Sequence, residues 1–184
     1  ILIANRGEIA CRIIQTAHEM GVRCVAVYVD DDRESPYVKM ADQSVRLPDD
    51  GYLDGKEIIK VAKEAGAEAI HPGYGFLSEN ASFARKVIKE GLIWIGPSAH
   101  AISVMGDKLK AKELAEKAEV PTLPMASSSK DANKIGYPLL IKAAAGGGGK
   151  GMRIVHKSKD LNEAIKSAQR EAKSGFGDER IFIE

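Results

Sequence analysis

The 184 residues are 44% hydrophobic and 29% charged, which is typical of one or two small folded domains with a buried core. A formal charge of +1 and an aromatic content of only 5% exclude the usual features of a nucleic-acid-binding protein. The chain holds no apolar run near the roughly 18 residues that span a bilayer, and its first residues include no cationic stretch ahead of an apolar segment, which is the pattern of a signal peptide. We therefore expect a soluble, intracellular protein with no nucleic-acid or membrane partner.

Up to about residue 110, strand-like and helix-like patterns alternate, which predicts parallel βαβ units with helices packed on the sheet. Strands are expected at 1–4, 22–29, 68–71 and 92–95, and helices at 9–20, 53–65, 80–90 and after Ser98. The third strand leads into Pro72-Gly73-Tyr74-Gly75. Loops at the carboxyl ends of strands are where such sheets bind ligands.

The composition changes after Asp107. A helix with a narrow apolar face is expected at 108–118, as a bridge between domains, and a polar, mobile segment at 125–130. Further strands are expected at 137–141, 152–155 and 181–183, with an amphipathic helix at 161–172. Because the chain ends inside an apolar strand, we expect it to be part of a larger protein.

Four consecutive glycines, Gly146 to Gly149, stand between two of these strands. Their backbone N–H groups can approach a ligand closely, which suits a mobile cover for phosphates. The run is not a P-loop or a dinucleotide turn, because the β-prone residues after Gly151 do not open a helix. Lys142 would extend toward a ligand under this loop, while Lys150 lies within it. The alternatives are a plain linker and solvated lysines.

Two other places combine unusual residues. Lys108 follows the helix-capping candidate Asp107, where a cation and helix N–H groups suit a phosphate, unless Asp107 simply neutralises the lysine. The segment from His71 to Asn80 predicts either a ligand-facing loop or a structural turn with Tyr74 and Phe76 in the core. The two cysteines are expected to be small core side chains, and His18, His100 and His156 have no partners at metal-ligand spacing.

Five motifs occur in one order: Asn5-Arg6-Gly7-Glu8-Ile9-Ala10, His71 to Asn80, Ile95-Gly96-Pro97, Met105-Gly106-Asp107-Lys108, and Ile141-Lys142 with Gly146 to Met152. Together they resemble the biotin carboxylase component of the biotin-dependent carboxylases, over nearly the whole chain but covering only that family's N-terminal portion. The resemblance implies an α/β fold. A Rossmann-like parallel-sheet domain is implied at 1–112, and the beginning of an ATP-grasp fold with a small α+β lid subdomain at 113–184.

In that family, MgATP converts bicarbonate into carboxyphosphate, and the CO₂ released from it is captured by biotin on a carrier. The resemblance thus implies an ATP-dependent ligase that uses ATP, Mg²⁺ or Mn²⁺, bicarbonate and carrier-linked biotin. The partners it implies are a biotin carboxyl carrier, a carboxyltransferase component and a second copy in a homodimer. The location would be the cytoplasm, or the mitochondrial matrix in a eukaryote, and the final acceptor an acyl-CoA, pyruvate or urea.

Residue roles are implied in the same way. The ATP-binding positions are Lys108, Lys142, Gly147, Gly148, Gly149, Met152 and Glu184. Tyr74, Gly75 and Phe76 would face the biotin ring, and Arg12 matches a position in a homodimer interface. The family's catalytic residues and metal ligands lie beyond Glu184, so we expect no catalytic residue and no metal site in this chain, which alone would be inactive.

Segments 44–52 and 125–135 are shorter than the family's corresponding stretches. Two alternatives remain open. A carbamoyl-phosphate-type ATP-grasp ligase shares the activation of bicarbonate, although the Tyr74-Gly75-Phe76 loop argues against it. A non-catalytic nucleotide-binding module is the other, because the catalytic half is missing.

Overall fold

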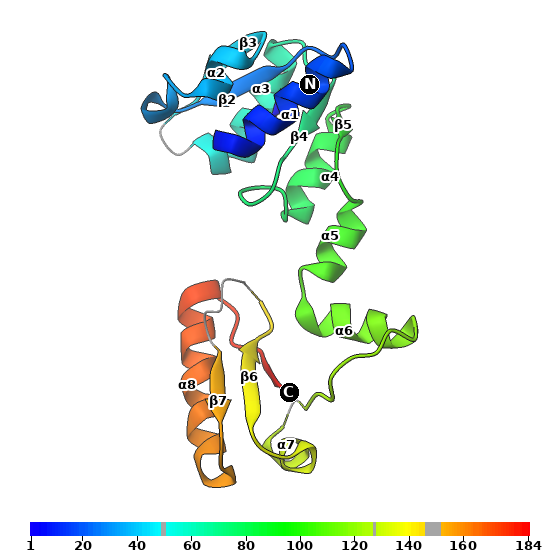
Figure 1. Cartoon of the computed structure of the whole chain (residues 1–184), viewed down its shortest axis with the longest axis vertical. Helices are drawn as coiled ribbons and strands as arrows, with labels where there is room; N and C mark the ends of the chain where they lie inside the picture. The colour runs from blue at the N-terminus through cyan, green and yellow to red at the C-terminus, as the bar shows by residue number, and fades with distance from the viewer. Residues whose placement is uncertain (49–50, 127, 146–151) are drawn as a thin grey trace. The chain divides into compact units, whose positions relative to one another are not determined.

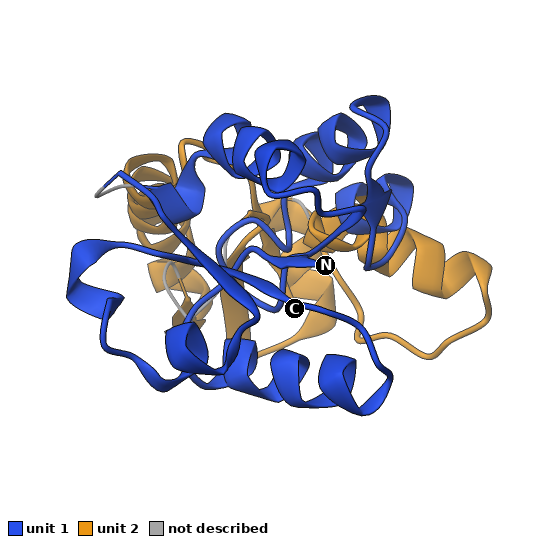
Figure 2. Cartoon of the chain, turned by 90° about the horizontal axis from the view of Figure 1, so that it is seen from above, with its two compact units in different colours: residues 1–103 blue, residues 104–184 orange. Residues whose placement is uncertain are grey.

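The computed structural model describes residues 1–48, 51–126, 128–145 and 152–184. It divides into two compact units, Ile1–Ser103 and Val104–Glu184 (Figure 1, Figure 2). The predicted boundary at Lys112 falls inside a helix of the second unit, so the helix expected as a bridge belongs to that unit. Within the described residues, no helix is both long and apolar enough to cross a bilayer.

The first unit is built on a five-stranded parallel sheet with the order β3-β2-β1-β4-β5. The strands are β1 (Leu2–Ile3), β2 (Val25–Tyr28), β3 (Gln43–Arg46), β4 (Ala69–His71) and β5 (Ile93–Trp94). The parallel α/β prediction is confirmed. Successive strands run outward from β1 to one side and then continue from β4 on the other. The carboxyl ends of β1 and β4 therefore form a topological switch point, where sheets of this kind bind ligands.

Helices cover both faces of this sheet. They are α1 (Gly7–Glu19), α2 (Pro36–Met40), α3 (Gly55–Glu64) and α4 (Ala81–Lys89), with short 3₁₀ turns η1 (Asp30–Asp32) and η2 (Gly51–Leu53), and α5 (Ala99–Met105) follows β5 along the chain. Because side chains alternate along a strand, Leu2 joins the core under α3 and α4, whereas Ile3 joins the core under α1 and α2. Asn80 caps α4, its side chain accepting from the Phe83 backbone N–H at 2.9 Å.

The second unit holds a three-stranded antiparallel sheet with the order β7-β6-β8. The strands are β6 (Leu139–Ala143), β7 (Arg153–Val155) and β8 (Ile181–Ile183), and the helices are α6 (Lys108–Lys117), α7 (Ser129–Ile135) and α8 (Ser158–Phe176). Helix α8 packs on all three strands over a core that includes Leu139, Ile141 and Ile183. The even-numbered residues of β6 consequently point away from α8.

Three elements were missed by the sequence-based prediction. Strand β3 lies at the sheet edge, is mostly exposed and has no alternation of apolar residues to reveal it. Helices α2 and α7 are short, and α7 begins within the segment 125–130, which was expected to be polar and mobile. Only the cap signals at Ser35-Pro36 and Ser128 mark where these two helices begin.

Candidate functional site

An ion pair joins Lys142 of β6 to Glu184, the residue that follows β8. The register of the two strands sets Lys142 opposite Phe182 and Leu140 beside Glu184, so these four side chains share the face turned away from α8. The Lys142 ammonium group contacts Oε1 of Glu184, and the two side chains are only 29% and 10% exposed. The structure thus brings together two residues that are separated by 42 positions in the sequence and were assigned independently.

Lys112 of α6 completes this cluster. Its ammonium nitrogen lies 3.3 Å from Oε2 of Glu184 and donates to the Leu123 carbonyl at 2.9 Å. It also lies 5.8 Å from the centroid of the Phe182 ring, within the range of a cation–π contact. Sequence reasoning missed Lys112, because one lysine among several on a polar helix carries no distinguishing signal.

The charge state of Glu184 follows from these neighbours. Burial acts to raise the pKa of its carboxyl group, but the ion pairs with Lys142 and then Lys112 outweigh burial and hold the pKa below its ordinary value. Glu184 is therefore ionised at neutral pH. A carboxylate offers about four acceptor positions, so the group can still accept from an amino donor while it binds two lysines.

The amino terminus of α6 is tied to the same sheet. Asp107 caps the helix by accepting from the backbone N–H groups of Leu109 at 3.1 Å and Lys110 at 3.3 Å, and it also accepts from Arg180 at 3.0 Å. The backbone N–H of Lys108 donates to the Ala144 carbonyl at 3.3 Å. Lys108 thus lies next to the end of β6. The backbone N–H groups of Leu109 and Lys110 already donate to Asp107, so they are not free to bind a phosphate.

The glycine run connects β6 to β7, which confirms the predicted strands on either side of it. The predicted positions Gly147, Gly148 and Gly149 lie outside the described residues. Met152, the first described residue after the run, has a side chain that is half exposed and lies one position before β7.

A second set of site residues lies in the first unit, at the switch point of the sheet. Asn5 follows β1, and its side-chain amide donates to the carbonyls of Pro72 at 2.8 Å and Tyr74 at 2.7 Å. Gly73 lies between them with φ +65°, and a Cβ atom there would stand 2.7 Å from the Asn5 amide nitrogen. The buried asparagine therefore holds the loop after β4 in place and requires glycine at position 73.

The aromatic residues of this loop face outward. Tyr74 is 59% exposed and Phe76 is 43% exposed, so the alternative that placed both in the core is wrong. Gly75 and Phe76 have φ values of +65° and +43°, which is uncommon for a residue with a side chain. Phe76 stacks on the ring of Tyr52, and this contact holds it at the surface.

Under Phe76 lies a buried polar network that the sequence did not reveal. The hydroxyl of Tyr52 donates to Asp32 at 2.7 Å and lies 2.8 Å from the hydroxyl of Tyr37. Arg6, at the start of α1, donates to Asp32 at 2.5 Å through Nε. The Arg6 guanidinium holds the pKa of Asp32 well below its usual range. Only the position of Asn5-Arg6 directly after a strand could have signalled it.

Arg12 lies exposed on α1, where its guanidinium donates to the Thr16 hydroxyl.

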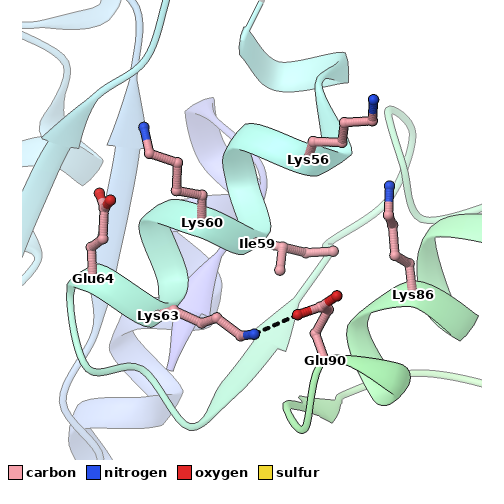
Figure 3. A pocket seen from close by; sticks show the side chains of 7 residues that line it. All are labelled: Lys56, Ile59, Lys60, Lys63, Glu64, Lys86 and Glu90. Atoms are coloured by element: carbon pink, nitrogen blue, oxygen red, sulfur yellow. Dashed lines mark hydrogen bonds and ion pairs between the residues drawn. The ribbon is translucent and has the colours of Figure 1, made fainter.

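A separate hollow of about 510 Å³ lies between α3 and α4 (Figure 3). Figure 3 shows Lys63 of α3 joined across it to Glu90, which follows α4, and Lys60 is paired with Glu57 at 3.1 Å. Four lysines and two glutamates line this hollow. It lies on the helical layer instead of at the carboxyl ends of the strands, and we assign it no part in the site.

Comparison with known proteins matches each part of the chain to a family. A family model described as "Biotin carboxylase, N-terminal domain" matches residues 1–102, and one described as "Carbamoyl-phosphate synthase L chain, ATP binding domain" matches residues 107–184. The chain is 52% identical to the mitochondrial methylcrotonoyl-CoA carboxylase subunit alpha of Dictyostelium discoideum, with 100% of this chain and 28% of that protein covered.

Solved structures agree. A biotin carboxylase from Campylobacter jejuni in complex with β-γ-ATP matches with a TM-score of 0.95 and 45% identity, over 100% of this chain and 44% of that one. The biotin carboxylase domain dimer of Hydrogenobacter thermophilus 2-oxoglutarate carboxylase, in complex with MgADP, ADP and bicarbonate, matches with a TM-score of 0.93 and 42% identity, over 100% of this chain and 43% of that one.

The chain thus spans less than a third of the Dictyostelium subunit and less than half of either solved chain. The alignment with the subunit runs over 196 positions against 184 residues, so that relative holds 12 positions that this chain lacks. Their assignment to 44–52 and 125–135 stays a prediction.

Proposed function

Because the chain belongs to the biotin carboxylase family, we propose that it forms the N-terminal part of an enzyme that carboxylates carrier-linked biotin with bicarbonate and ATP. The observation that carries the proposal is the family match over residues 1–102. The family model that matches residues 107–184 is described by carbamoyl-phosphate synthase. ATP binding alone therefore does not distinguish biotin carboxylation from a carbamoyl-phosphate-type reaction.

The second unit supplies the nucleotide contacts. The residues present fit an adenine nucleotide, because the ammonium groups of Lys112 and Lys142 meet the Glu184 carboxylate in a partly buried cluster. Lys142 and Lys108 would bind phosphate oxygens, and Glu184 would accept from the adenine amino group. Gly147, Gly148, Gly149 and Met152 would cover the phosphates and exclude water. When bound, MgATP supplies the phosphoryl group that gives bicarbonate a leaving group.

The first unit supplies a surface for biotin. Tyr74 and Phe76 present exposed rings from a loop that Asn5 fixes through two hydrogen bonds, so little loop entropy is lost on binding. Gly75, between them, leaves room for a ring to approach the backbone. The ligand would be a biotin group delivered by a carrier domain, and the product would pass to a carboxyltransferase component.

Two assignments follow from the relatives. One solved relative is described as a dimer, and we propose a homodimer in which exposed Arg12 contributes to the interface. The Dictyostelium relative is described as mitochondrial, which supports the mitochondrial matrix for a eukaryotic source, with the cytoplasm as the bacterial counterpart.

The test is calorimetric titration of ATP into the complete protein that carries this sequence. At an effective dielectric constant near 20, one cation about 4 Å from a phosphate oxygen contributes roughly 4 kcal/mol before desolvation. Lys142→Ala should therefore weaken ATP binding about tenfold or more, since tenfold corresponds to about 1.4 kcal/mol. The matched control is Lys134→Ala, which removes an exposed lysine that is also ion-paired, to Asp131.

The same preparation discriminates the proposed reaction from the carbamoyl-phosphate type. Bicarbonate-dependent ATP hydrolysis that free biotin stimulates supports the proposal. Hydrolysis that biotin leaves unchanged and an amine donor stimulates would support the alternative, and binding of ATP without any hydrolysis would support a non-catalytic module.

A further inference from the structure

Three side chains of different chemistry meet at the amino-terminal edge of the first sheet. His18 lies near the end of α1, Cys24 directly precedes β2, and Asp42 directly precedes β3. The imidazole nitrogen, the thiol sulfur and a carboxylate oxygen all lie within 4.8 Å of one another. The sequence offers His18 no partner at metal-ligand spacing, because folding of the parallel strands brings together residues whose sequence spacing forms no motif.

Asp42 is the fixed point of this cluster. Its Oδ2 accepts from the backbone N–H of Cys24 at 2.7 Å and lies 2.9 Å from Nε2 of His18. The His18 and Asp42 side chains are about two-fifths exposed, whereas Cys24 is fully buried. The cluster therefore has a closed side at the sulfur and an open side at the imidazole and carboxylate.

The distances suit a small metal ion. Tetrahedral bonds of about 2.0–2.3 Å separate neighbouring ligand atoms by roughly 3.3–3.7 Å. The widest separation allowed by the cluster exceeds this by only about 1 Å, which small side-chain rotations can close. Cys24 and Asp42 also help to line a hollow of about 640 Å³.

The donor set selects the ion. Thiolate, imidazole and carboxylate together suit zinc, whereas magnesium and calcium prefer oxygen alone. A cysteine binds a metal ion as the thiolate, because the cation beside the sulfur favours the charged form. Binding would replace the S–H bond with a sulfur–metal bond and release the proton to water.

We propose that His18, Cys24 and Asp42 form a zinc-binding site whose fourth position is open to water. The ion would connect the end of α1 to the starts of β2 and β3. This site lies at the opposite end of the strands from the loop after β4, and the inference rests on no part of the proposed function.

Cobalt(II) titration of the purified full-length protein tests the site, with a chelator treatment beforehand. Cobalt bound to a thiolate gives a sulfur-to-metal charge-transfer band in the near ultraviolet. The wild type should show a saturable band at one cobalt per chain, which added zinc abolishes. Cys24→Ser should remove the band, and Cys11→Ser, which changes the other free cysteine, should keep it.

His18→Gln provides a second measurement that does not depend on a buried position. The side chain is exposed, so the variant should fold as the wild type does. It should weaken cobalt binding about tenfold or more, whereas His156→Gln should leave it unchanged. A wild type with no charge-transfer band would overturn the proposal. So would a band that persists in Cys24→Ser or an affinity that His18→Gln leaves unaltered.

Discussion

The ring of Phe76 stacks on the ring of Tyr52, with centroids 5.4 Å apart and 29° between the ring planes. The contact joins the exposed loop after β4 to a buried network, because the Tyr52 hydroxyl binds Asp32 and Tyr37. The ring of Tyr52 thus supports the exposed Phe76, while its hydroxyl group forms hydrogen bonds with buried polar side chains. The two functions can be separated by mutation.

Tyr52→Phe should destabilise the first unit while the loop keeps its conformation. The substitution retains the ring that stacks on Phe76 but leaves the buried Asp32 carboxylate without one of its donors. Loss of a hydrogen bond to a charged group costs about 2 kcal/mol. Urea denaturation measures the change, and an unaltered midpoint would contradict the buried network.

Phe76→Leu should change the stability of the first unit little and should instead affect the exposed loop. The residue is partly exposed, so losing the stacked pair should cost about 1 kcal/mol or less. If the loop faces biotin as proposed, the KM for biotin in biotin-stimulated ATP hydrolysis should rise severalfold while the Kd for ATP stays constant. A rise in both would point to general damage instead of a local role.

Gly73→Ala should destabilise the first unit by more than backbone strain alone would. Its φ of +65° is strained for alanine, and the new Cβ would stand 2.7 Å from the Asn5 amide nitrogen. The strain costs about 1 kcal/mol, and displacing Asn5 from two carbonyls adds about 2 kcal/mol.

Gly66→Ala is the matched control for that substitution. Its φ is +72°, but a Cβ there meets nothing within 4 Å, so only the backbone strain of about 1 kcal/mol applies. Thermal unfolding compares the two variants. Equal losses would mean that Asn5 does not clamp the loop.

Asp107→Ala should destabilise the second unit by about 1–2 kcal/mol, because it removes the cap of α6. Asp107→Asn keeps a side-chain oxygen for Leu109 and Lys110 but loses the charge that binds Arg180. The asparagine variant should therefore retain most of the stability. Denaturant midpoints rank the two, and an equal loss in both would contradict the capping role.

Acid should weaken the second unit through Glu184. Its pKa is held below the ordinary 4.5, so the folded state favours the ionised form. This stabilisation is complete above about pH 4.5 and is lost as the pH falls through the lower, folded-state pKa. The stability difference between wild type and Glu184→Gln should thus shrink between pH 6 and pH 3, about where carboxyl groups titrate. Glu179→Gln, at an exposed position, controls for the general loss of a charge.

The sequence predicted the helices and strands in which apolar residues recur at a regular spacing. Alternating apolar runs and helical spacing located β1, β4 and α3, and ordered motifs identified the family. Strand β3 was not predicted because apolar and polar residues do not alternate along this exposed edge strand.

Contacts between residues that are far apart in the sequence could not be predicted from it. Lys142 and Glu184 were assigned separately, and only the register of β6 and β8 pairs them. Lys112, Asp32 and Tyr52 have ordinary neighbours, so their roles appear only when strands and helices meet. The same reason conceals the cluster of His18, Cys24 and Asp42.

The pairing of Lys142 with Glu184 changes how a phosphate group would be bound. A lysine that already has an anionic partner exchanges one partner for another, and the free energy gained is the difference between the two contacts. Such an exchange limits affinity and favours rapid release of product. If Lys142 moved from Glu184 to a phosphate, the Glu184 carboxylate would keep Lys112 as its counterion. The exchange would therefore leave no buried charge without a partner.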